Sequence, residues 1–548
     1  MVGILPDRAA IARLVGAALM EQTDEWTEAR RYTGLEFLTK ARLRVIDGAT
    51  PDLRSTSGNS PLNLQKQDHA EINSYTIPLD ATAATRGPDV WRRARPTSFT
   101  RSAVKRKSAL ALTSGRRSTP DAARRCSRTA LVASSAICLR EPGRSMPEMT
   151  TWADASIHPF RIDIPQSDLD DLHERLDRTR WPDELPGVGW SYGVPRDYLK
   201  ELAHYWRHVY DWRAAEAELN RWPQYTTTID GASIHFAHLR SPEPDAIPLL
   251  MTHGWPGSIV EFTNVVGPLT DPRAHGGNPA DAFHLVLPSI PGFGLSGPTT
   301  QPGWEFKRVA AAFAELMARL GYAQYGVQGG DWGAVISREL GRTRPDRVIG
   351  VHLNLLPDSF QAQEPDADEL KALAPNERER TLASWERIKA WSRERQGYAD
   401  LQATRPQTLA YGLTDSPVGQ LAWIAEKFKE WTDSRDRPED AVDRDQMLTN
   451  VMLYWLTGTA GSSARLYYER AHADYWGTLP EPSTAPTALA VFPRDNFIPL
   501  RHIADRTNTI VQWTEYERGG HFAAMEQPEL LVGDIRTFFR KLRETTPK

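Results

Sequence analysis

The middle of the chain alternates between strand-like and helix-like segments, and this alternation constrains the fold more than any other feature. Short apolar runs predict strands, and longer runs with apolar residues at helical spacing predict helices. The expected strands are 248–252, 284–288, 325–328 and 348–355, and the expected helices are 306–320 and 333–343. Strands that alternate with helices favour a largely parallel sheet with helices on both faces.

The segments on either side extend this core. Residues 157–222 show helical spacing, and two alternating runs then flank Asp230-Gly231, which predicts a β-hairpin over 225–239. Residues 358 to about 478 are helical and rich in Trp and Tyr. The α/β pattern resumes with expected strands at 485–492 and 510–516 and a closing helix at 527–542. The sequence therefore predicts an α/β core with a helical insertion late in the chain.

The turn Gly329-Gly330-Asp331-Trp332-Gly333 lies between an expected strand and an expected helix. A sharp, strained bend needs small neighbours around its central residue. The pattern resembles the nucleophile elbow of the α/β-hydrolases, with Asp in the place where esterases have Ser. Taken alone, the turn is equally compatible with Asp331 as a helix N-cap.

Two downstream residues favour the catalytic interpretation. In the α/β-hydrolases an acid and then a histidine follow the nucleophile along the chain. Asp495, in Phe492-Pro-Arg-Asp, follows one expected strand, and His521, in Gly519-Gly-His-Phe, follows the next. Because open parallel sheets place their sites at the carboxyl ends of strands, we expect Asp331, Asp495 and His521 to meet.

The loop His253-Gly-Trp-Pro-Gly-Ser follows the expected strand that ends at Thr252. In this fold one oxyanion-binding N–H group comes from such a loop, and a second comes from the residue after the nucleophile. These positions predict the backbone N–H groups of Trp255 and Trp332 as the oxyanion donors.

From Ile157 to the C-terminus the chain resembles the microsomal-type epoxide hydrolases, including the segment that precedes their core. The matching motifs are Asn220-Arg-Trp-Pro, His253-Gly-Trp-Pro-Gly-Ser, Gly329-Gly-Asp-Trp-Gly, Asp415-Ser-Pro-Val-Gly, Tyr454-Trp-Leu-Thr-Gly-Thr and Gly519-Gly-His-Phe-Ala-Ala. The resemblance implies an α/β-hydrolase fold in four parts. These are an N-terminal extension at 1–148, the epoxide hydrolase N-terminal segment with the first hairpin at 149–240, the core at 241–357 and 479–548, and a helical lid at 358–478.

The resemblance also implies two lid tyrosines that face the nucleophile. By motif they are Tyr398, in Gln396-Gly-Tyr-Ala, and Tyr467, in Arg465-Leu-Tyr-Tyr-Glu, with Tyr468 as the alternative to Tyr467. Asp495 stands where some relatives have Glu, which changes the reach of the side chain but not its role. The N-terminal extension does not resemble the membrane anchor of the mammalian relatives, so no anchor is expected.

The implied reaction converts a small apolar epoxide and water to a vicinal diol, a detoxification chemistry. A carboxylate nucleophile forms an alkyl ester that a second step hydrolyses. Asp331 would attack an epoxide carbon while Tyr398 and Tyr467 hydrogen-bond the ring oxygen. His521, oriented by Asp495, would then activate water. No metal or organic cofactor is implied, and a homo-oligomeric assembly is left open.

Two other functions remain open at this point. A haloalkane or haloacid dehalogenase can use the same nucleophile, acid and base, with Trp332 as a halide-stabilising donor. A catalytically silent binding protein could keep a lidded apolar pocket. The paired lid tyrosines oppose the first alternative, and the intact set of Asp331, Asp495 and His521 opposes the second.

The first 148 residues differ in composition from the rest. Between Arg86 and Arg144 fifteen Lys or Arg residues stand against three acidic ones, with few large apolar side chains. Residues 49–145 are therefore predicted to be disordered. Residues 11–41 resemble the C-terminal end of mutator-type transposases. This indicates a fused remnant or a start codon assigned too early, with Met146 and Met149 as alternative starts.

Composition also bears on partners and location. The formal net charge of −4, and the lack of interleaved aromatic residues in the basic stretch, give no reason to expect nucleic acid as a partner. Cys126 and Cys138 are the two cysteines, too few for a disulfide framework and suited to a reducing cytoplasm. No apolar run is long enough to predict a membrane-spanning helix.

Overall fold

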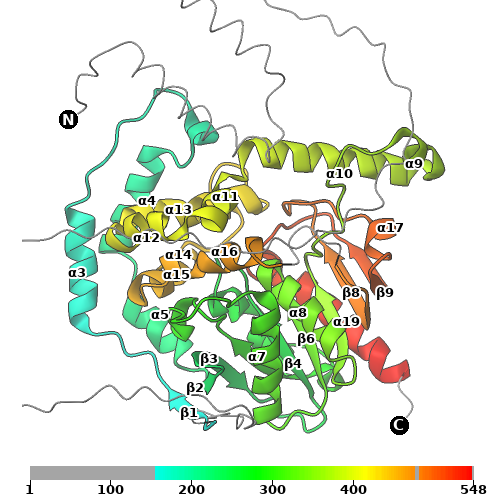
Figure 1. Ribbon diagram of the computed structural model, residues 1–548. Coiled ribbons are helices and arrows are strands. Elements are labelled where there is room, and N and C mark those ends of the chain that lie inside the picture. Colours follow the sequence, from blue (N-terminus) through cyan, green and yellow to red (C-terminus); the bar gives the residue numbers. More distant parts are fainter. Residues whose placement is uncertain (1–154, 475–479, 546–548) are drawn as a thin grey trace, which may run out of the picture. The chain divides into compact units, whose positions relative to one another are not determined.

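The computed structural model describes residues 155–474 and 480–545 (Figure 1). The predictions for the N-terminal extension, its disorder and its resemblance to transposases, fall outside these residues. Within the described part of the chain, no helix combines the length and the apolar character needed to cross a membrane.

The described strands form one sheet in the order β1-β2-β3-β5-β4-β6-β7-β8-β9. Their bounds are β1 His158–Phe160, β2 Gln224–Ile229, β3 Ala232–Leu239, β4 Ile247–Thr252, β5 Phe283–Pro288, β6 Tyr325–Gly329, β7 Val348–Leu353, β8 Ser483–Val491 and β9 Asn508–Glu515. The pairs from β5 through β9 are parallel, whereas β1, β2 and β3 pair antiparallel. The mostly parallel sheet predicted from the sequence is confirmed.

The predicted hairpin is formed by β2 and β3, and its turn explains the Asp-Gly pair. Asp230 has a φ of 49° and Gly231 a φ of 77°. Two left-handed residues give the turn that matches the twist of the flanking strands. Strand β1 was not predicted. It is short, and it pairs with a strand distant in sequence, placing His158 opposite Thr226, so no local pattern encodes it.

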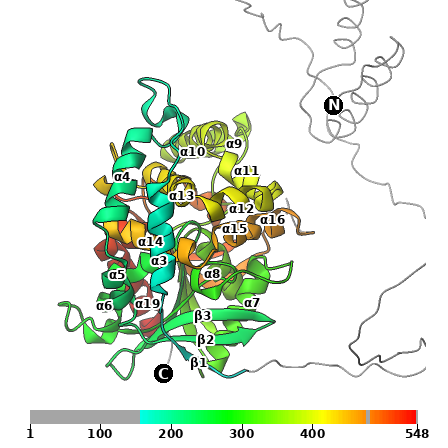
Figure 2. The same cartoon turned by 90° about the vertical axis from the view of Figure 1, so that its left-hand side faces the viewer.

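Helices cover both faces of the sheet. α8 (Asp331–Thr343) packs on one face, since a Cβ added at its Gly341 would meet Val351 of β7. A Cβ at Gly350 would instead meet side chains of α19 (Pro528–Thr545). Because neighbouring strand residues face opposite sides, α8 and α19 lie on opposite faces. α7 (Phe306–Arg319) lies beside α8 (Figure 1), and α6 (Thr263–Thr270) lies beside α19 (Figure 2).

A group of helices is inserted between β7 and β8, above the carboxyl ends of the parallel strands (Figure 1). They are α9 Ala367–Ala372, α10 Pro375–Glu394, α11 Gly397–Thr404, α12 Pro406–Asp415, α13 Pro417–Trp431, α14 Arg444–Leu456, α15 Ala460–Ser463 and α16 Arg465–Ala471. Two short helices, α17 Arg501–Ala504 and α18 Ala523–Glu526, lie in the loops that follow β8 and β9.

The helices before the hairpin pack against this insertion. They are α3 Gln166–Asp177, α4 Arg196–His208 and α5 Trp212–Leu219. Both α3 and α4 contact α13 (Figure 2). Their helical spacing accounts for this packing, because the residues it aligns on one face of α3, Leu169, Leu172 and Leu176, are buried. The insertion is therefore held from two sides, by the core below and by these helices.

Candidate active site

The turn between β6 and α8 places Asp331 at the carboxyl edge of the sheet. Asp331 has a φ of 49°, a left-handed conformation that is uncommon for a residue other than glycine. The turn leaves no room for larger neighbours. A Cβ at Gly333 would overlap the Thr252 carbonyl oxygen, and a Cβ at Gly329 would overlap the Gly333 backbone. The small residues around Asp331 therefore follow from the bend itself.

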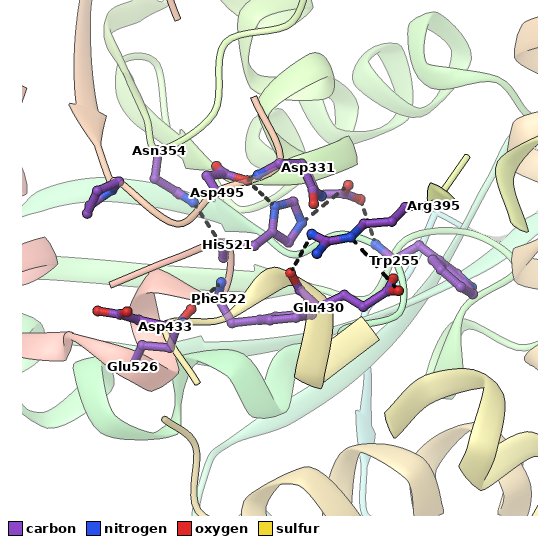
Figure 3. A network of polar contacts seen from close by, with 12 residues as sticks. Trp255, Asp331, Asn354, Arg395, Glu430, Asp433, Asp495, His521, Phe522 and Glu526 are labelled. Atoms are coloured by element: carbon purple, nitrogen blue, oxygen red, sulfur yellow. Dashed lines mark hydrogen bonds and ion pairs between the residues drawn. The ribbon is translucent and has the colours of Figure 1, made fainter. Parts of the chain in front are cut away.

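The two carboxylate oxygens of Asp331 have different surroundings (Figure 3). Oδ1 accepts a hydrogen bond of 2.8 Å from the backbone N–H of Trp255, in the loop after β4. Oδ2 lies 3.5 Å from Nε2 of His521. The Asp331 side chain is 21% exposed, compared with 2% for His521. Of the two, Asp331 is the one that a small molecule can reach.

His521 is held between two carboxylates. Its Nδ1 lies 2.7 Å from Oδ1 of Asp495, and both side chains are buried. Burial alone would lower the pKa of His521, but Asp495 and Asp331 outweigh it and hold that pKa well above its ordinary value. The imidazole is thus oriented by Asp495 on one side and points toward Asp331 on the other, as expected from the order of the motifs.

A set of hydrogen bonds fixes the loop that carries His521 (Figure 3). The backbone N–H of His521 donates to the carbonyl of Trp431, at the end of α13, over 2.8 Å. The carboxylate of Glu526 accepts from the N–H groups of Phe522 and Asp433, over 3.0 and 2.8 Å. Burial raises the pKa of Glu526 to about 8. Sequence reasoning missed Glu526, which lies beyond the Gly-Gly-His-Phe-Ala-Ala motif.

Two helices of the insertion bring tyrosines to the same place. Tyr398 of α11 stacks on the indole of Trp255, with centroids 5.1 Å apart and an interplanar angle of 8°. The ring centroid of Tyr467, in α16, lies 6.0 Å from that of Tyr398 and 4.9 Å from that of Trp332, and both pairs pack edge to face. Burial, supplemented by the charge of Asp331, raises the pKa of Tyr398 above its ordinary value. Burial and the neighbouring Tyr398 and Asp331 do the same to Tyr467.

Tyr468 occupies a different environment from Tyr467. Its side chain is 37% exposed, and its ring stacks on His472 with centroids 3.9 Å apart. Adjacent residues of a helix point about 100° apart, so only one of the two can face the core. The geometry places Tyr467, not Tyr468, beside Tyr398.

The backbone N–H of Trp332 belongs to the first turn of α8, directly after Asp331. The first N–H groups of a helix have no partner within that helix. The Trp332 N–H is therefore available to bind an oxyanion, at the same edge of the sheet as the N–H of Trp255. Within the described residues, no cluster of three or more His, Cys, Asp or Glu side chains could hold a metal ion.

Comparison with known proteins identifies the family of the chain. A model of the epoxide hydrolase N terminus matches residues 157–262, and a model of the alpha/beta hydrolase fold matches residues 247–528. A Stigmatella aurantiaca protein assigned to the epoxide hydrolases is 49% identical over 388 residues, covering 71% of this chain and 86% of that protein. The chain belongs to the epoxide hydrolase family.

Further relatives support the same membership. Epoxide hydrolase 1 of Oryctolagus cuniculus is 36% identical over 404 residues, covering 70% of this chain and 89% of that protein. The crystal structure of juvenile hormone epoxide hydrolase from Bombyx mori superimposes with a TM-score of 0.65 at 33% identity, covering 73% of this chain and 97% of that one. The family and the α/β-hydrolase fold expected from the sequence are confirmed.

Proposed function

We propose that the protein hydrolyses an apolar epoxide to a vicinal diol in two steps, through an ester on Asp331. The observation that carries this proposal is the position of Asp331. Its reachable carboxylate lies in a tight turn beside His521. Tyr398 and Tyr467, from the inserted helices, pack against Trp255 and Trp332. The aromatic rings gathered around this carboxylate suit an apolar substrate.

In the first step Oδ2 of Asp331 attacks one epoxide carbon, and the bond from that carbon to the ring oxygen breaks. Oδ1 already accepts the Trp255 N–H, so it becomes the carbonyl oxygen of the ester without moving. The hydroxyls of Tyr398 and Tyr467 hydrogen-bond the ring oxygen, and one of them gives it a proton. Their raised pKa values keep both groups protonated and therefore able to donate.

The second step depends on a change in the charge around His521. Esterification neutralises Asp331, one of the two carboxylates that raise the pKa of His521. The pKa of His521 therefore falls, so the imidazole is more often neutral and able to accept a proton at the stage when a base is needed. It takes a proton from a water molecule, whose oxygen attacks the ester carbonyl carbon. The N–H groups of Trp255 and Trp332 stabilise the resulting oxyanion. Its collapse breaks the bond between the carbonyl carbon and the alkyl oxygen, and the imidazolium of His521 gives its proton to that oxygen to complete the diol. The proton left on the Asp331 carboxyl group returns to the tyrosinate, which restores both residues.

The dehalogenase alternative has less support. In that reaction the Trp332 indole would stabilise the departing halide, but this indole packs edge to face against the ring of Tyr467, with centroids 4.9 Å apart. Measuring halide release and diol formation on one preparation, with a haloalkane and an epoxide as substrates, separates the two activities. Diol without halide supports the proposal, and halide without diol overturns it. The cytoplasmic location and the detoxification role stay predictions.

Trapping the ester tests the mechanism. His521→Gln should form the ester but hydrolyse it slowly, so incubation with styrene oxide should add the mass of one substrate to the peptide that contains Asp331. Asp331→Asn should gain no mass. His472→Gln, which changes an exposed histidine near the site, should turn over like the wild type. An unmodified Asp331 peptide in His521→Gln would contradict the covalent step.

A further inference from the structure

A buried lysine lies against the site, and none of the steps above uses it. Lys427 of α13 is 2% exposed. Its ammonium nitrogen lies 4.8 Å from the ring centroid of Tyr398 and 5.8 Å from that of Trp431. A buried ammonium group is unfavourable unless nearby groups compensate it. The ammonium group of Lys427 must therefore be stabilised by the groups that it contacts.

Part of the compensation comes from carboxylates on the same helix. Lys427 forms a close ion pair with Glu426 and a second one of 3.3 Å with Glu430. The side chains of Glu426 and Glu430 are 25% and 22% exposed, compared with 3% for Lys427. A lysine side chain can usually extend to keep its charge in water. Here the ammonium group stays inside, over the face of Tyr398.

We propose that Lys427 is a positioning residue that strengthens the Tyr398 hydroxyl as a hydrogen-bond donor to the epoxide oxygen. A cation over an aromatic face is attracted by the electrons of the ring. That attraction grows as negative charge develops on the phenol oxygen during ring opening, so it favours the transition state over the ground state. The inference rests on the proposed function, which places Tyr398 beside the ring oxygen.

The charged groups around Tyr398 act in opposite directions. Asp331 and Glu430 both raise its pKa, whereas the ammonium group of Lys427 favours negative charge on the ring. Two further charges pair with these groups: Glu426 forms an ion pair with Lys427, and Arg395 lies 4.0 Å from Glu430. Removing Lys427 and removing Glu430 should therefore have opposite effects on Tyr398. A lysine that merely holds α13 in place would produce no such opposition.

The first experiment measures ester formation and ester hydrolysis separately, in single turnovers of styrene oxide with enzyme in excess. Lys427→Gln should slow ester formation about 3- to 30-fold, the range expected for losing one cation–π contact. It should leave the rate of ester hydrolysis unchanged. Lys427→Arg, which keeps a cation at this position, should keep most of the wild-type rate of ester formation. In a Tyr398→Phe background, Lys427→Gln should have no further effect. An equal loss in both backgrounds would overturn the inference.

The second experiment needs no substrate, so its result stands even if the proposed function fails. Fluorotyrosine is incorporated at position 398, and the pKa of its hydroxyl is followed by absorbance of the phenolate. The pKa should rise in Lys427→Gln, stay close to the wild type in Lys427→Arg and fall in Glu430→Gln. The Glu430→Gln arm remains informative if Lys427→Gln does not fold. An unchanged pKa in Lys427→Gln, or a rise in Glu430→Gln, would overturn the inference.

Discussion

Adding one methyl group at Gly333 should disable the site, because Gly333 is where α8 meets the end of β4. A Cβ there would overlap the Thr252 carbonyl oxygen and lie 2.8 Å from that of His253. Both neighbours are backbone atoms, so no flexible side chain can move aside. Overfilling a packed site in this way costs about 1–3 kcal/mol of stability. The strand end must shift, and the Trp255 N–H that holds Asp331 must shift with it.

Gly333→Ala is best compared with Gly412→Ala. Gly412 lies inside α12, and a Cβ there would have no heavy atom within 4 Å. Because alanine is the better helix former, Gly412→Ala should stabilise the protein by up to about 1 kcal/mol. The free energy of unfolding is measured by urea denaturation, and epoxide turnover is measured on the same samples. A Gly333→Ala protein with wild-type stability and turnover would refute this account of the elbow.

Three further predictions concern the lid tyrosines, Glu526 and a second buried carboxylate, Asp534. Tyr398→Phe and Tyr467→Phe should each slow ester formation about 10²-fold without loss of folding, while Tyr468→Phe should have little effect. Single-turnover rates measure these changes. A large loss in Tyr468→Phe with little loss in Tyr467→Phe would contradict the assignment of Tyr467. Glu526→Gln should lower kcat, because Glu526 orders the loop that carries His521; an unchanged kcat would show that this contact is dispensable. Although burial opposes it, hydrogen bonding to His352 lowers the pKa of Asp534 to about 2, below its ordinary value of 3.8. The resulting stability is present above about pH 4 and is lost as the pH falls toward 2, so urea denaturation of Asp534→Asn should show a weaker pH dependence in that window than the wild type.

The parts of this site that the sequence predicted are those set by the local chain. The bend at Asp331 requires small neighbours within two residues, so the elbow can be recognised from a short motif. Asp495 and His521 follow strands of one parallel sheet, and the topology alone brings them to the same edge.

The parts that the sequence did not predict depend on packing between distant elements. Lys427 lies in a helix whose other charged residues, Glu426, Lys429 and Glu430, are only partly buried, and only the position of α11 brings Tyr398 beneath it. Glu526 gains its role from Asp433, a contact between the inserted helices and the core. The choice between Tyr467 and Tyr468 rests on the rotation of α16, which a motif of adjacent tyrosines does not define.

The origin of the oxygen in the diol distinguishes attack on the epoxide by Asp331 from attack by water. With enzyme in excess and a single turnover in ¹⁸O-labelled water, the first diol should carry an oxygen from Asp331 and contain almost no label. The label should appear on Asp331 itself, because water attacks the ester carbonyl carbon, not the epoxide. Mass spectrometry of the diol and of the Asp331 peptide measures both. Fully labelled diol in the first turnover, with unlabelled Asp331, would contradict the ester mechanism.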